Sequence, residues 1–588
     1  AAFLPIYLAE GSMGEYTGVL FVVVTITLLC SWLLALTVIP LLCTQFLKVK
    51  PLEGEDAFNS RFYRTYRGVL VGLVRFPLVS FALVVGIFLF AMQGFGLIPN
   101  LFFPPDDTPM MTAKFEAPIG TSIEKTERLV ADLDELIESE LLSTDDRPDG
   151  VVNWSAYVGQ GAPRFTLSYG PPPSSPEYAY LLFNLTTADV IPEFARKIEQ
   201  FCAERYPSVI PTVGPLALGS VISNPVEVRV SGSDRDRVFE LVDSIKAQMQ
   251  TIEGTKNIND DWGQQTKKLT VAIDEARARR SGITHQDVAM SLQSVLNGYE
   301  ATEYREGTEL IPVTIRSIAA DRKDVSKLES LNVYSQSQGT SVPLMQVAEL
   351  GIEWQPAKLL RRDRLTTVTV SSELADGATP LDVTVPLGEW LEKEQASWPP
   401  GYFYEFGGEL EESGKSQGAI NDKLPYAGLF IVILLVAQFN SVRRALIILL
   451  TIPLALVGVV IGLLLTKSFF GFMTLLGLIS LAGIVINNAI VLIDRIAIEI
   501  NDNGFEPPQA IIEAAQRRLR PILLTTVTTV GGLIPLWLGG GPMWESMAIA
   551  IIFGLIFATL LTLGVVPVLY ALLFRVSFKG FRYKPAGT

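Results

Sequence analysis

Residues 483–494 read GIVINNAIVLID and lie inside an apolar range, residues 472–494, that is long enough to cross a membrane. Two adjacent amides, Asn487 and Asn488, interrupt the apolar run. An unpaired polar group in the hydrocarbon core of a bilayer costs on the order of several kcal/mol. We therefore expect these amides to have a partner or a function, and we expect other parts of the chain to cross the membrane as well.

Apolar runs of about 20 residues, the length needed to span a bilayer, recur along the chain. The 588 residues have a mean hydropathy of +0.34 and a hydrophobic content of 49%. This composition is too apolar for an ordinary soluble protein, and the chain is too long for one domain. The predicted spans are residues 17–46, 78–98, 424–440, 445–466, 472–494, 521–541 and 546–574.

Charge also differs between the predicted membrane spans and the polar region between the second and third of them. Acidic residues outnumber basic ones between the second and third spans, whereas basic residues of the membrane part gather in every second loop. The positive-inside rule places the basic loops in the cytoplasm and the acidic domain on the opposite face. An acidic exterior domain also argues against nucleic-acid binding. The basic residues are Lys48, Lys50, Arg61, Arg64, Arg67, Arg75, Arg443, Arg444, Arg495, Arg517, Arg518, Arg520, Arg575, Lys579, Arg582 and Lys584.

The three cysteines, Cys30, Cys43 and Cys202, do not form the pattern of a disulfide framework. We expect all three to be buried apolar fillers. The first residues, AAFLPIYLAE, lack the basic segment of a signal peptide, so we expect the chain to begin within a longer protein.

An internal repeat supports a transporter-like plan. Residues 3–15 read FLPIYLAEGSMGE and residues 533–545 read LIPLWLGGGPMWE, with Pro, Met and Glu aligned without a gap. The chain therefore contains one complete membrane repeat and the end of an earlier copy. Parallel repeats are common in transporters, whose working site lies near the repeat interface at the membrane midplane.

The polar domain alternates strands and helices. Residues 110–118 alternate as a strand before an amphipathic helix that Thr121 or Ser122 would cap. The same strand-then-helix order recurs at 225–250 and 267–296, and residues 298–315 are typical of a β-hairpin. The predicted fold is an α-helical transmembrane bundle with a large α+β periplasmic domain built of βαβ-type units and a parallel internal repeat.

Four segments carry a resemblance to a known family: FFPPDDTP (102–109), SGITHQDVAMSLQ (281–293), NNAIVLID (487–494) and RRLRPILLTT (517–526). In order and spacing the chain resembles the resistance-nodulation-division (RND) transporters, particularly their hydrophobe/amphiphile multidrug efflux branch. The resemblance implies a proton-driven pump of the bacterial inner membrane that exports small hydrophobic or amphiphilic substrates. It further implies a homotrimer, contact with membrane lipids, and docking through a periplasmic adaptor protein to an outer-membrane channel.

The resemblance divides the chain into six parts. They are residues 1–50, the end of the first membrane repeat with the end of its fifth span and its sixth; 51–77, a cytoplasmic amphipathic connector; 78–98, the seventh span; 99–422, the periplasmic porter and docking domain; 423–575, spans eight to twelve; and 576–588, a cytoplasmic tail.

The resemblance assigns a proton relay to Asn487, Asn488, Thr525 and Arg518. The position of Asn487 is often a Lys in the family, and an amide cannot titrate. Either the protonatable group comes from the first repeat, or the pump does not use protons at this site. Each residue also has a structural interpretation. The amides could hydrogen-bond a neighbouring helix, Thr525 could bond its own helix, and Arg518 could be an ordinary positive-inside anchor.

Aromatic residues mark a candidate substrate pocket. Trp154, Tyr157, Phe165 and Tyr169 lie near a loop where the family lines a pocket with aromatic side chains. Aromatic rings suit varied apolar ligands because they offer a large and tolerant contact area. Aromatic residues at strand spacing are also ordinary core residues, so both interpretations stay open.

Several functions are disfavoured by what the sequence contains. His285, the single histidine, is expected to be solvated at the start of a helix, and we expect no metal site and no cofactor. We see no phosphate-binding GxxxxGK[ST] motif and no nucleophile beside a base, so we expect neither ATP use nor enzymatic activity. The alternatives are RND-type export of lipids or metal ions, with metals disfavoured by scattered Met residues, and a non-transporting membrane scaffold or receptor.

Overall fold

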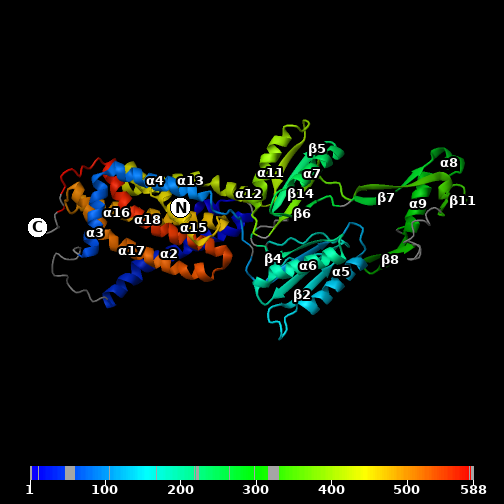
Figure 1. The fold of residues 1–588 in the computed structure, drawn as a ribbon, viewed down its shortest axis with the longest axis horizontal. Helices are drawn as coiled ribbons and strands as arrows, with labels where there is room; N and C mark the ends of the chain where they lie inside the picture. Colours follow the sequence, from blue (N-terminus) through cyan, green and yellow to red (C-terminus); the bar gives the residue numbers. More distant parts are fainter. Residues whose placement is uncertain are drawn as a thin grey trace. The chain divides into compact units, whose positions relative to one another are not determined.

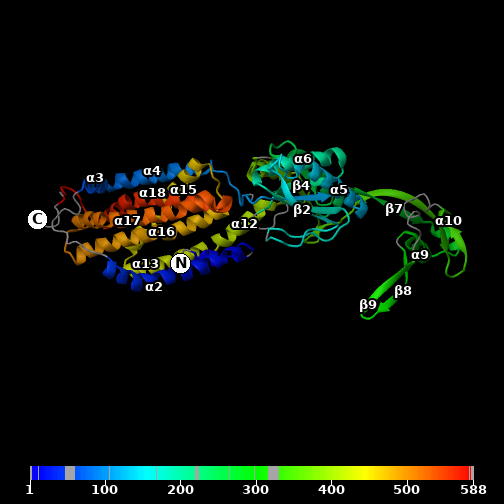
Figure 2. The same ribbon diagram turned by 90° about the horizontal axis from the view of Figure 1, so that it is seen from below.

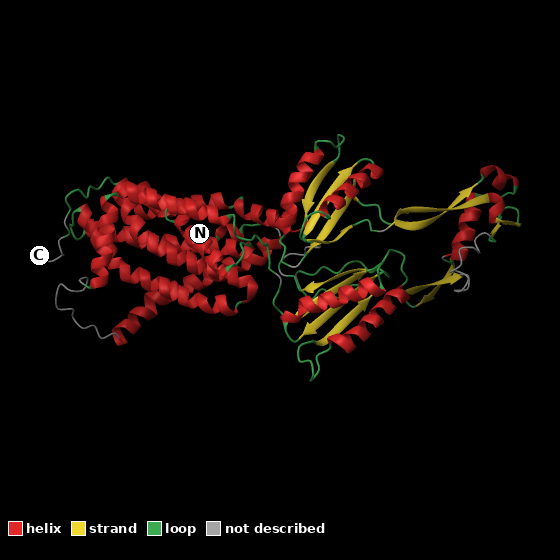
Figure 3. Cartoon of the chain, in the orientation of Figure 1, coloured by secondary structure: helices red, strands yellow, loops and turns green. Residues whose placement is uncertain are grey.

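The computed structural model describes residues 3–10, 12–46, 60–104, 106–166, 168–217, 219, 224–263, 265–296, 298–315, 330–375, 377–581 and 583. The basic residues Lys48, Lys50, Arg582 and Lys584 lie outside this described part. The chain divides into two compact units, with residues 118–120 and 262–360 in the second and all others in the first. Figures 1, 2 and 3 show the elements of both.

The first unit contains the membrane helices. In the described residues, seven helical segments are long and apolar enough to span a membrane, and each overlaps one predicted span. The predicted membrane bundle is therefore confirmed at the level of its spans. The segments are α2 (span Thr17–Phe46), α4 (Pro77–Phe95), α12 with α13 (Gly408–Phe439), α14 with α15 (Val442–Thr466), α16 (Phe472–Asn501), α17 (Pro507–Gly539) and α18 (Gly541–Leu573).

Helix α18 forms the centre of the bundle because glycines let its neighbours approach closely. It packs against α15, α16 and α17 (Figures 1 and 2). A Cβ on Gly458 would lie 2.4 Å from the Phe553 carbonyl oxygen, and one on Gly554 would lie 2.2 Å from a methyl group of Leu481. Small residues at such crossings allow tight helix packing within a membrane.

Helix α2 has a different environment. No residue of its most apolar stretch is buried against the rest of the chain. Cys30 and Cys43 on this helix are consequently exposed, so the prediction of burial is wrong for both, because it assumed that the described chain covers the helix. Cys202, on α6, is buried as predicted. The shorter helices of the membrane part are α1 (Leu4–Tyr7) and the amphipathic α3 (Arg61–Arg75).

Two α/β lobes complete the first unit. Lobe 1 has an antiparallel sheet of order β2-β3-β1-β4 with helices α5 and α6, and its core includes Phe115, Leu133, Phe183 and Ile198. Its elements are β1 (Met110–Glu116), α5 (Ile123–Leu136), η1 (Ile137–Leu141), β2 (Val151–Val158), β3 (Tyr178–Leu185), η2 (Ala188–Val190), α6 (Ile191–Arg205) and β4 (Ile210–Pro215).

Lobe 2 has an antiparallel sheet of order β13-β14-β5-β15, and β6 also pairs with β14. Val228, Val230, Val368 and Val370 alternate along β5 and β14 and are fully buried, as expected for strands with one covered face. Its elements are β5 (Val226–Gly232), α7 (Arg235–Met249), β6 (Thr255–Asp260), β13 (Arg361–Arg362), β14 (Leu365–Leu374), α11 (Pro380–Gln395) and β15 (Phe403–Gly407).

The second unit has a small apolar core around Val288, Val333 and Leu344. The predicted hairpin is present, because β8 and β9 pair antiparallel from Tyr299↔Ile315 to Glu306↔Glu309. The elements are β7 (Gln265–Ile273), α8 (Glu275–Arg280), α9 (His285–Leu296), β8 (Tyr299–Glu306), β9 (Glu309–Ile315), β10 (Asn332–Tyr334), β11 (Ser341–Pro343), α10 (Leu344–Val347) and β12 (Ala348–Pro356).

Candidate functional sites

The two adjacent amides of α16 have different surroundings. Asn488 is 8% exposed, whereas Asn487 lies on an exposed face of the helix. Within the described residues neither side-chain amide has a hydrogen-bond partner. Asn487 shares its face with Asp494, seven residues further along, which is also exposed. The helix therefore turns one amide towards the packed bundle and the other away from it.

Helix α17 carries the other two predicted relay residues on one face, because seven residues make nearly two helical turns. Thr525 is exposed, and its hydroxyl donates to the Ile522 carbonyl at 2.8 Å. This contact matches the structural interpretation of a hydroxyl bonded to its own helix. Arg518 is half-buried, and its Nε has no hydrogen-bond partner among the described residues.

The neighbouring threonine is held differently. Thr526 is buried, and its Oγ1 lies 2.8 Å from Oγ1 of Thr559 on α18. The pair of hydroxyls therefore links α17 to α18, whereas Thr525, about 100° away around α17, is exposed. No hydrogen bond between α16 and α17 joins the four predicted relay residues in the described part of the chain.

Three of the four predicted pocket residues lie together in lobe 1. Phe165 is 39% exposed, and its ring lies 5.2 Å from the buried ring of Tyr169, which lies 4.8 Å from Tyr180. Tyr157 packs against the same cluster, which also contains Tyr178. Burial raises the pKa of the Tyr169, Tyr178 and Tyr180 hydroxyls, so these side chains are neutral at physiological pH.

Trp154 lies apart from this aromatic cluster. It packs against the main core of lobe 1, and its Nε1 donates to Oδ1 of Asp134 at 2.7 Å. The structure thus places Trp154 outside this cluster, which consists of Tyr157, Phe165, Tyr169, Tyr178 and Tyr180. Sequence reasoning missed Tyr178 and Tyr180, because the strand YAYLLFNL reads as ordinary core.

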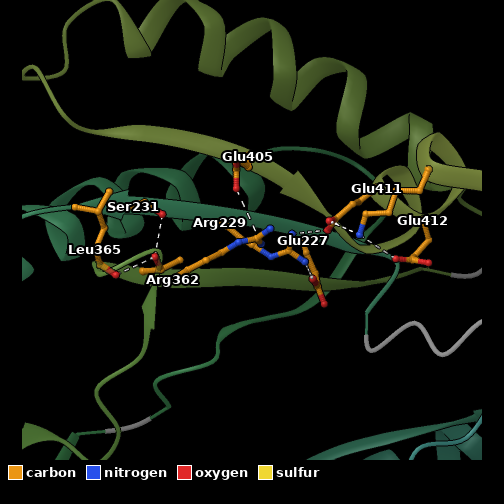
Figure 4. Close-up of polar contacts among 10 residues, drawn as sticks. Glu227, Arg229, Ser231, Arg362, Leu365, Glu405, Glu411 and Glu412 are labelled. Carbon is orange, nitrogen blue, oxygen red and sulfur yellow. Dashed lines mark hydrogen bonds and ion pairs between the residues drawn. The ribbon is translucent and has the colours of Figure 1, made fainter. Parts of the chain in front are cut away.

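A charged cluster that the sequence did not indicate connects lobe 2 to a membrane helix (Figure 4). Arg229 on β5 donates to Glu227 at 3.2 Å and to Glu411 on α12 (Gly408–Asn421). Lys415 contacts the same Glu411 at 2.7 Å. Helix α12 leads directly into α13 (Leu424–Phe439), so these contacts attach the lobe 2 sheet to a membrane-spanning segment.

No group of three or more His, Cys, Asp or Glu side chains that could hold a metal ion is found among the described residues. His285 is exposed at the first position of α9, as expected. Asp287, two residues later, is buried and accepts hydrogen bonds from the Thr284 N–H and hydroxyl at 2.9 and 2.8 Å. This part of the second unit is therefore a capped helix start.

Comparison with known proteins identifies the relatives of the chain. Residues 1–574 match the model of the AcrB/AcrD/AcrF family. The swarming motility protein SwrC of Bacillus subtilis is 24% identical over 597 residues, covering 100% of this chain and 54% of SwrC. The cobalt-zinc-cadmium resistance protein CzcA of Cupriavidus metallidurans is 24% identical over 597 residues, covering 97% of this chain and 54% of CzcA.

The fold also matches a solved structure. A crystal structure of a heavy metal efflux pump superposes with a TM-score of 0.75 at 22% identity, covering 98% of this chain and 57% of the pump. The predicted fold class is thereby confirmed. The chain spans about half the length of the curated relatives that it matches.

Proposed function

This chain belongs to the AcrB/AcrD/AcrF family of RND transporters, and on that premise we propose that it forms part of a proton-driven efflux pump. It is a multi-pass protein of the inner membrane with a large periplasmic domain, as the sequence predicted. In the proposed cycle, protons enter through the membrane bundle and drive export of a substrate from the periplasmic lobes. We propose transport rather than catalysis as its activity.

The observation that supports coupling is that two polar residues within apolar spans are left uncovered by the described bundle. Asn487 on α16 and Thr525 on α17 are both exposed within apolar spans. Polar groups at membrane depth tend to face a bundle interior or a wet cavity and to mark ion routes. We assign the relay to Asn487, Asn488, Thr525 and Arg518. Because amides and hydroxyls do not titrate here, the protonated carboxylate has to come from another part of the transporter.

For the substrate we propose apolar or amphiphilic compounds. The aromatic cluster of lobe 1 combines a partly exposed ring, Phe165, with buried neutral tyrosines behind it. Such a surface offers stacking and a few hydrogen-bond donors without a fixed charge, which suits varied apolar ligands.

Metal ions are the second candidate substrate. The names of CzcA and of the matched crystal structure point to metal export by those proteins. This chain is 24% identical to the first and 22% to the second, so the substrate does not follow from the likeness. A metal site in the pump would need ligands beyond the groupings present in the described residues.

By the same family relation we propose a homotrimer that works with a periplasmic adaptor protein and an outer-membrane channel, surrounded by membrane lipids. The transported species would then be protons inward and the substrate outward. No nucleic-acid partner is proposed, since the exterior domain is acidic.

The test is a substrate comparison with the full-length transporter in efflux-deficient cells. We expect efflux of apolar dyes above background, abolished by a proton uncoupler, and no gain in tolerance to cobalt, zinc or cadmium ions. A gain in metal tolerance without dye efflux would overturn the apolar substrate and support the metal candidate. Equal behaviour with and without the uncoupler would overturn proton coupling.

A further inference from the structure

Two fully buried carboxylates lie near the cytoplasmic ends of the relay helices. Glu499 near the end of α16 is 0% exposed, and Glu513 near the start of α17 is 2% exposed. Taking a carboxylate out of water is costly unless opposite charges and hydrogen bonds compensate. Their contacts show how the chain compensates.

Glu499 is surrounded by donors from both helices. Arg495, one turn earlier on α16, contacts Oε1 at 2.6 Å through Nη2 and at 2.8 Å through Nε. Arg517 of α17 contacts the same oxygen at 3.3 Å through Nη1. Asn503, just after α16, donates to Oε2 at 2.6 Å. One buried carboxylate thus joins the two helices that carry the proposed relay.

Glu513 extends the network to Tyr583, which follows the last membrane helix. Its Oε2 lies 3.8 Å from Nε of Arg517, and its Oε1 accepts a hydrogen bond from the Tyr583 hydroxyl at 2.6 Å. The guanidinium of Arg67, on α3, lies 4.2 Å from the centre of the Tyr583 ring. Arg517 therefore lies between the two buried carboxylates and is the residue that links them.

Helix geometry relates this network to the relay. Eleven residues separate Asn488 from Glu499, which places them about 20° apart around α16 at 3.6 residues per turn. Arg517 and Arg518 are adjacent, so they point about 100° apart around α17. When Arg517 is held by Glu499, the direction of Arg518 is fixed, and so is that of Thr525 on the same face.

The connection between the helices reinforces the constraint. Gly504 has φ +67°, a conformation that favours glycine, and the Phe505 N–H donates to the Glu499 carbonyl at 3.1 Å. Helix α17 then begins at Pro507. The short turn sets the spacing of the helix ends, and the ion pairs set their rotation.

Buried ion pairs contribute little net stability, but the loss of one partner is costly, and such pairs can select one arrangement among alternatives. We propose that Glu499 is a positioning residue, which through Arg517 holds α17 in the rotation that presents Arg518 and Thr525 to the relay. This inference rests on the proposed function. It assigns to Glu499 no contact with the transported proton.

The test measures helix placement separately from transport. In a full-length transporter with all native cysteines, Cys30, Cys43 and Cys202 among them, replaced by Ala, Thr526→Cys and Thr559→Cys form a reporter pair, because the two native hydroxyls lie 2.8 Å apart. Because a disulfide S–S bond is about 2 Å long, thiols in place of these hydroxyls need only a small movement to bond. With Glu499 present we expect rapid cross-linking, and we expect Glu499→Gln to slow it severalfold.

Transport is measured without the reporter pair. We expect Glu499→Gln to lower efflux per folded trimer at least about tenfold, since misplacement of a working group by about 1 Å can cost up to about a hundredfold in rate. Arg517→Lys, which keeps the charge but loses the guanidinium fork, should lower it less. Glu193→Gln, at an exposed Lys197 pair, is the control and should change neither cross-linking nor efflux.

A second variant covers the case in which Glu499→Gln fails to fold. Glu499→Leu combined with Arg517→Leu removes both charges of the interhelical pair and should restore more folded protein than Glu499→Leu alone. Positioning requires that this double variant still shows slow cross-linking in the reporter background and low efflux per trimer. Recovery of normal efflux with the recovered protein would show that Glu499 is needed only for stability and would overturn the proposal.

The outcomes also separate this proposal from the relay itself. If Glu499→Gln changes neither cross-linking nor efflux while Asn487→Leu loses efflux, the positioning role of Glu499 is refuted and the proposed relay stands. If cross-linking is slowed in Glu499→Gln while efflux is undiminished in both Glu499→Gln and Asn487→Leu, the relay is refuted, although Glu499 would still position α17.

Discussion

Adjacent positions on an α-helix point about 100° apart, and this rotation gives the two neighbouring amides of α16 different surroundings. Asn488 is buried among the helices of this chain, whereas Asn487 is exposed. The apolar run shows that both residues lie in the membrane, but the face of each depends on which helices pack against α16. The structural and functional interpretations can therefore be tested on the exposed amide alone.

The first prediction concerns Asn487. In the full-length transporter, Asn487→Leu is expected to abolish proton-driven efflux while trimer assembly stays near normal, because the amide has no hydrogen-bond partner among the described residues. Thr525→Val, which keeps the shape and removes the hydroxyl, should fail at the same step with substrate still bound. Dye efflux per folded trimer is the measurement.

Thr528→Val is the matched control, because within the described residues the Thr528 hydroxyl bonds only to the Leu524 and Thr525 carbonyls of its own helix, at 2.9 and 3.0 Å. This variant should transport normally. Undiminished efflux in Asn487→Leu would remove that residue from the relay.

The second prediction separates two aromatic residues. Phe165→Ala should lower efflux of apolar dyes severalfold with normal amounts of folded protein, because the ring is partly exposed at the edge of the aromatic cluster. Trp154→Phe removes the hydrogen bond to Asp134 and should cost about 1 kcal/mol of stability, with efflux per trimer unchanged. Measuring dye efflux and thermal stability of both variants tests the pocket. Normal efflux in Phe165→Ala would exclude that ring.

At the scale of elements, the start of α9 depends on one carboxylate. Hydrogen bonds from the Thr284 N–H and hydroxyl lower the pKa of Asp287 below its usual 3.8, although burial opposes them. A lowered folded-state pKa contributes stability above the unfolded value, and this contribution is lost as the pH falls through the folded value.

The third prediction follows from this pH dependence of the stability that Asp287 contributes. Asp287→Asn should speed hydrogen exchange of the α9 backbone at pH 7. The difference from the native protein should shrink as the pH falls below the usual Asp value of 3.8 and through the lower pKa of the folded protein, where the native carboxylate becomes protonated. Hydrogen exchange of the variant and of the native protein is measured at each pH by mass spectrometry. Glu309→Gln, at an exposed strand position of the same unit, should have no effect on α9. A difference that stays constant down to the lowest pH would contradict the role of the charge.

The sequence predicts elements well where one physical property decides them. Long uncharged runs identified all seven spans, but α17 begins at Pro507 rather than near 521, because its charged first turns lie outside the apolar run. The strand-then-helix order predicted for residues 267–296 is also present, with β7 over Gln265–Ile273 and α9 over His285–Leu296.

The contacts between distant charged residues could not be predicted from the sequence. Glu499 and Arg517 are 18 positions apart, and their pairing depends on the antiparallel packing of α16 and α17. Likewise, Arg229 and Glu411 meet only because β5 lies beside the β15–α12 junction. Such contacts carry no local signal, whereas a cap such as Thr284 with Asp287 does.

At the scale of the whole molecule, the membrane part is unevenly covered. Helix α18 is largely buried, whereas little of the most apolar stretch of α17 and none of that of α2 is buried. In a membrane, an exposed face meets either lipid or another polypeptide. The polar residues Asn487 and Thr525 lie on exposed faces, and polar groups are disfavoured in lipid. The proposed relay therefore requires that protein from elsewhere in the transporter covers these faces.

The last prediction concerns the direction in which the bundle crosses the membrane. Ser441 precedes α14 and lies beside Arg443 and Arg444, whereas Lys467 ends α15 in a left-handed conformation with φ +55°. One spanning segment, Val442–Thr466, separates them. Alkaline phosphatase, which is active only after export, should be active when fused at Lys467 and inactive at Ser441. A green fluorescent protein, which fluoresces after folding in the cytoplasm, should show the opposite pattern. Export at Ser441 would invert every span and would place the acidic lobes in the cytoplasm, where they could not take substrate from the periplasm.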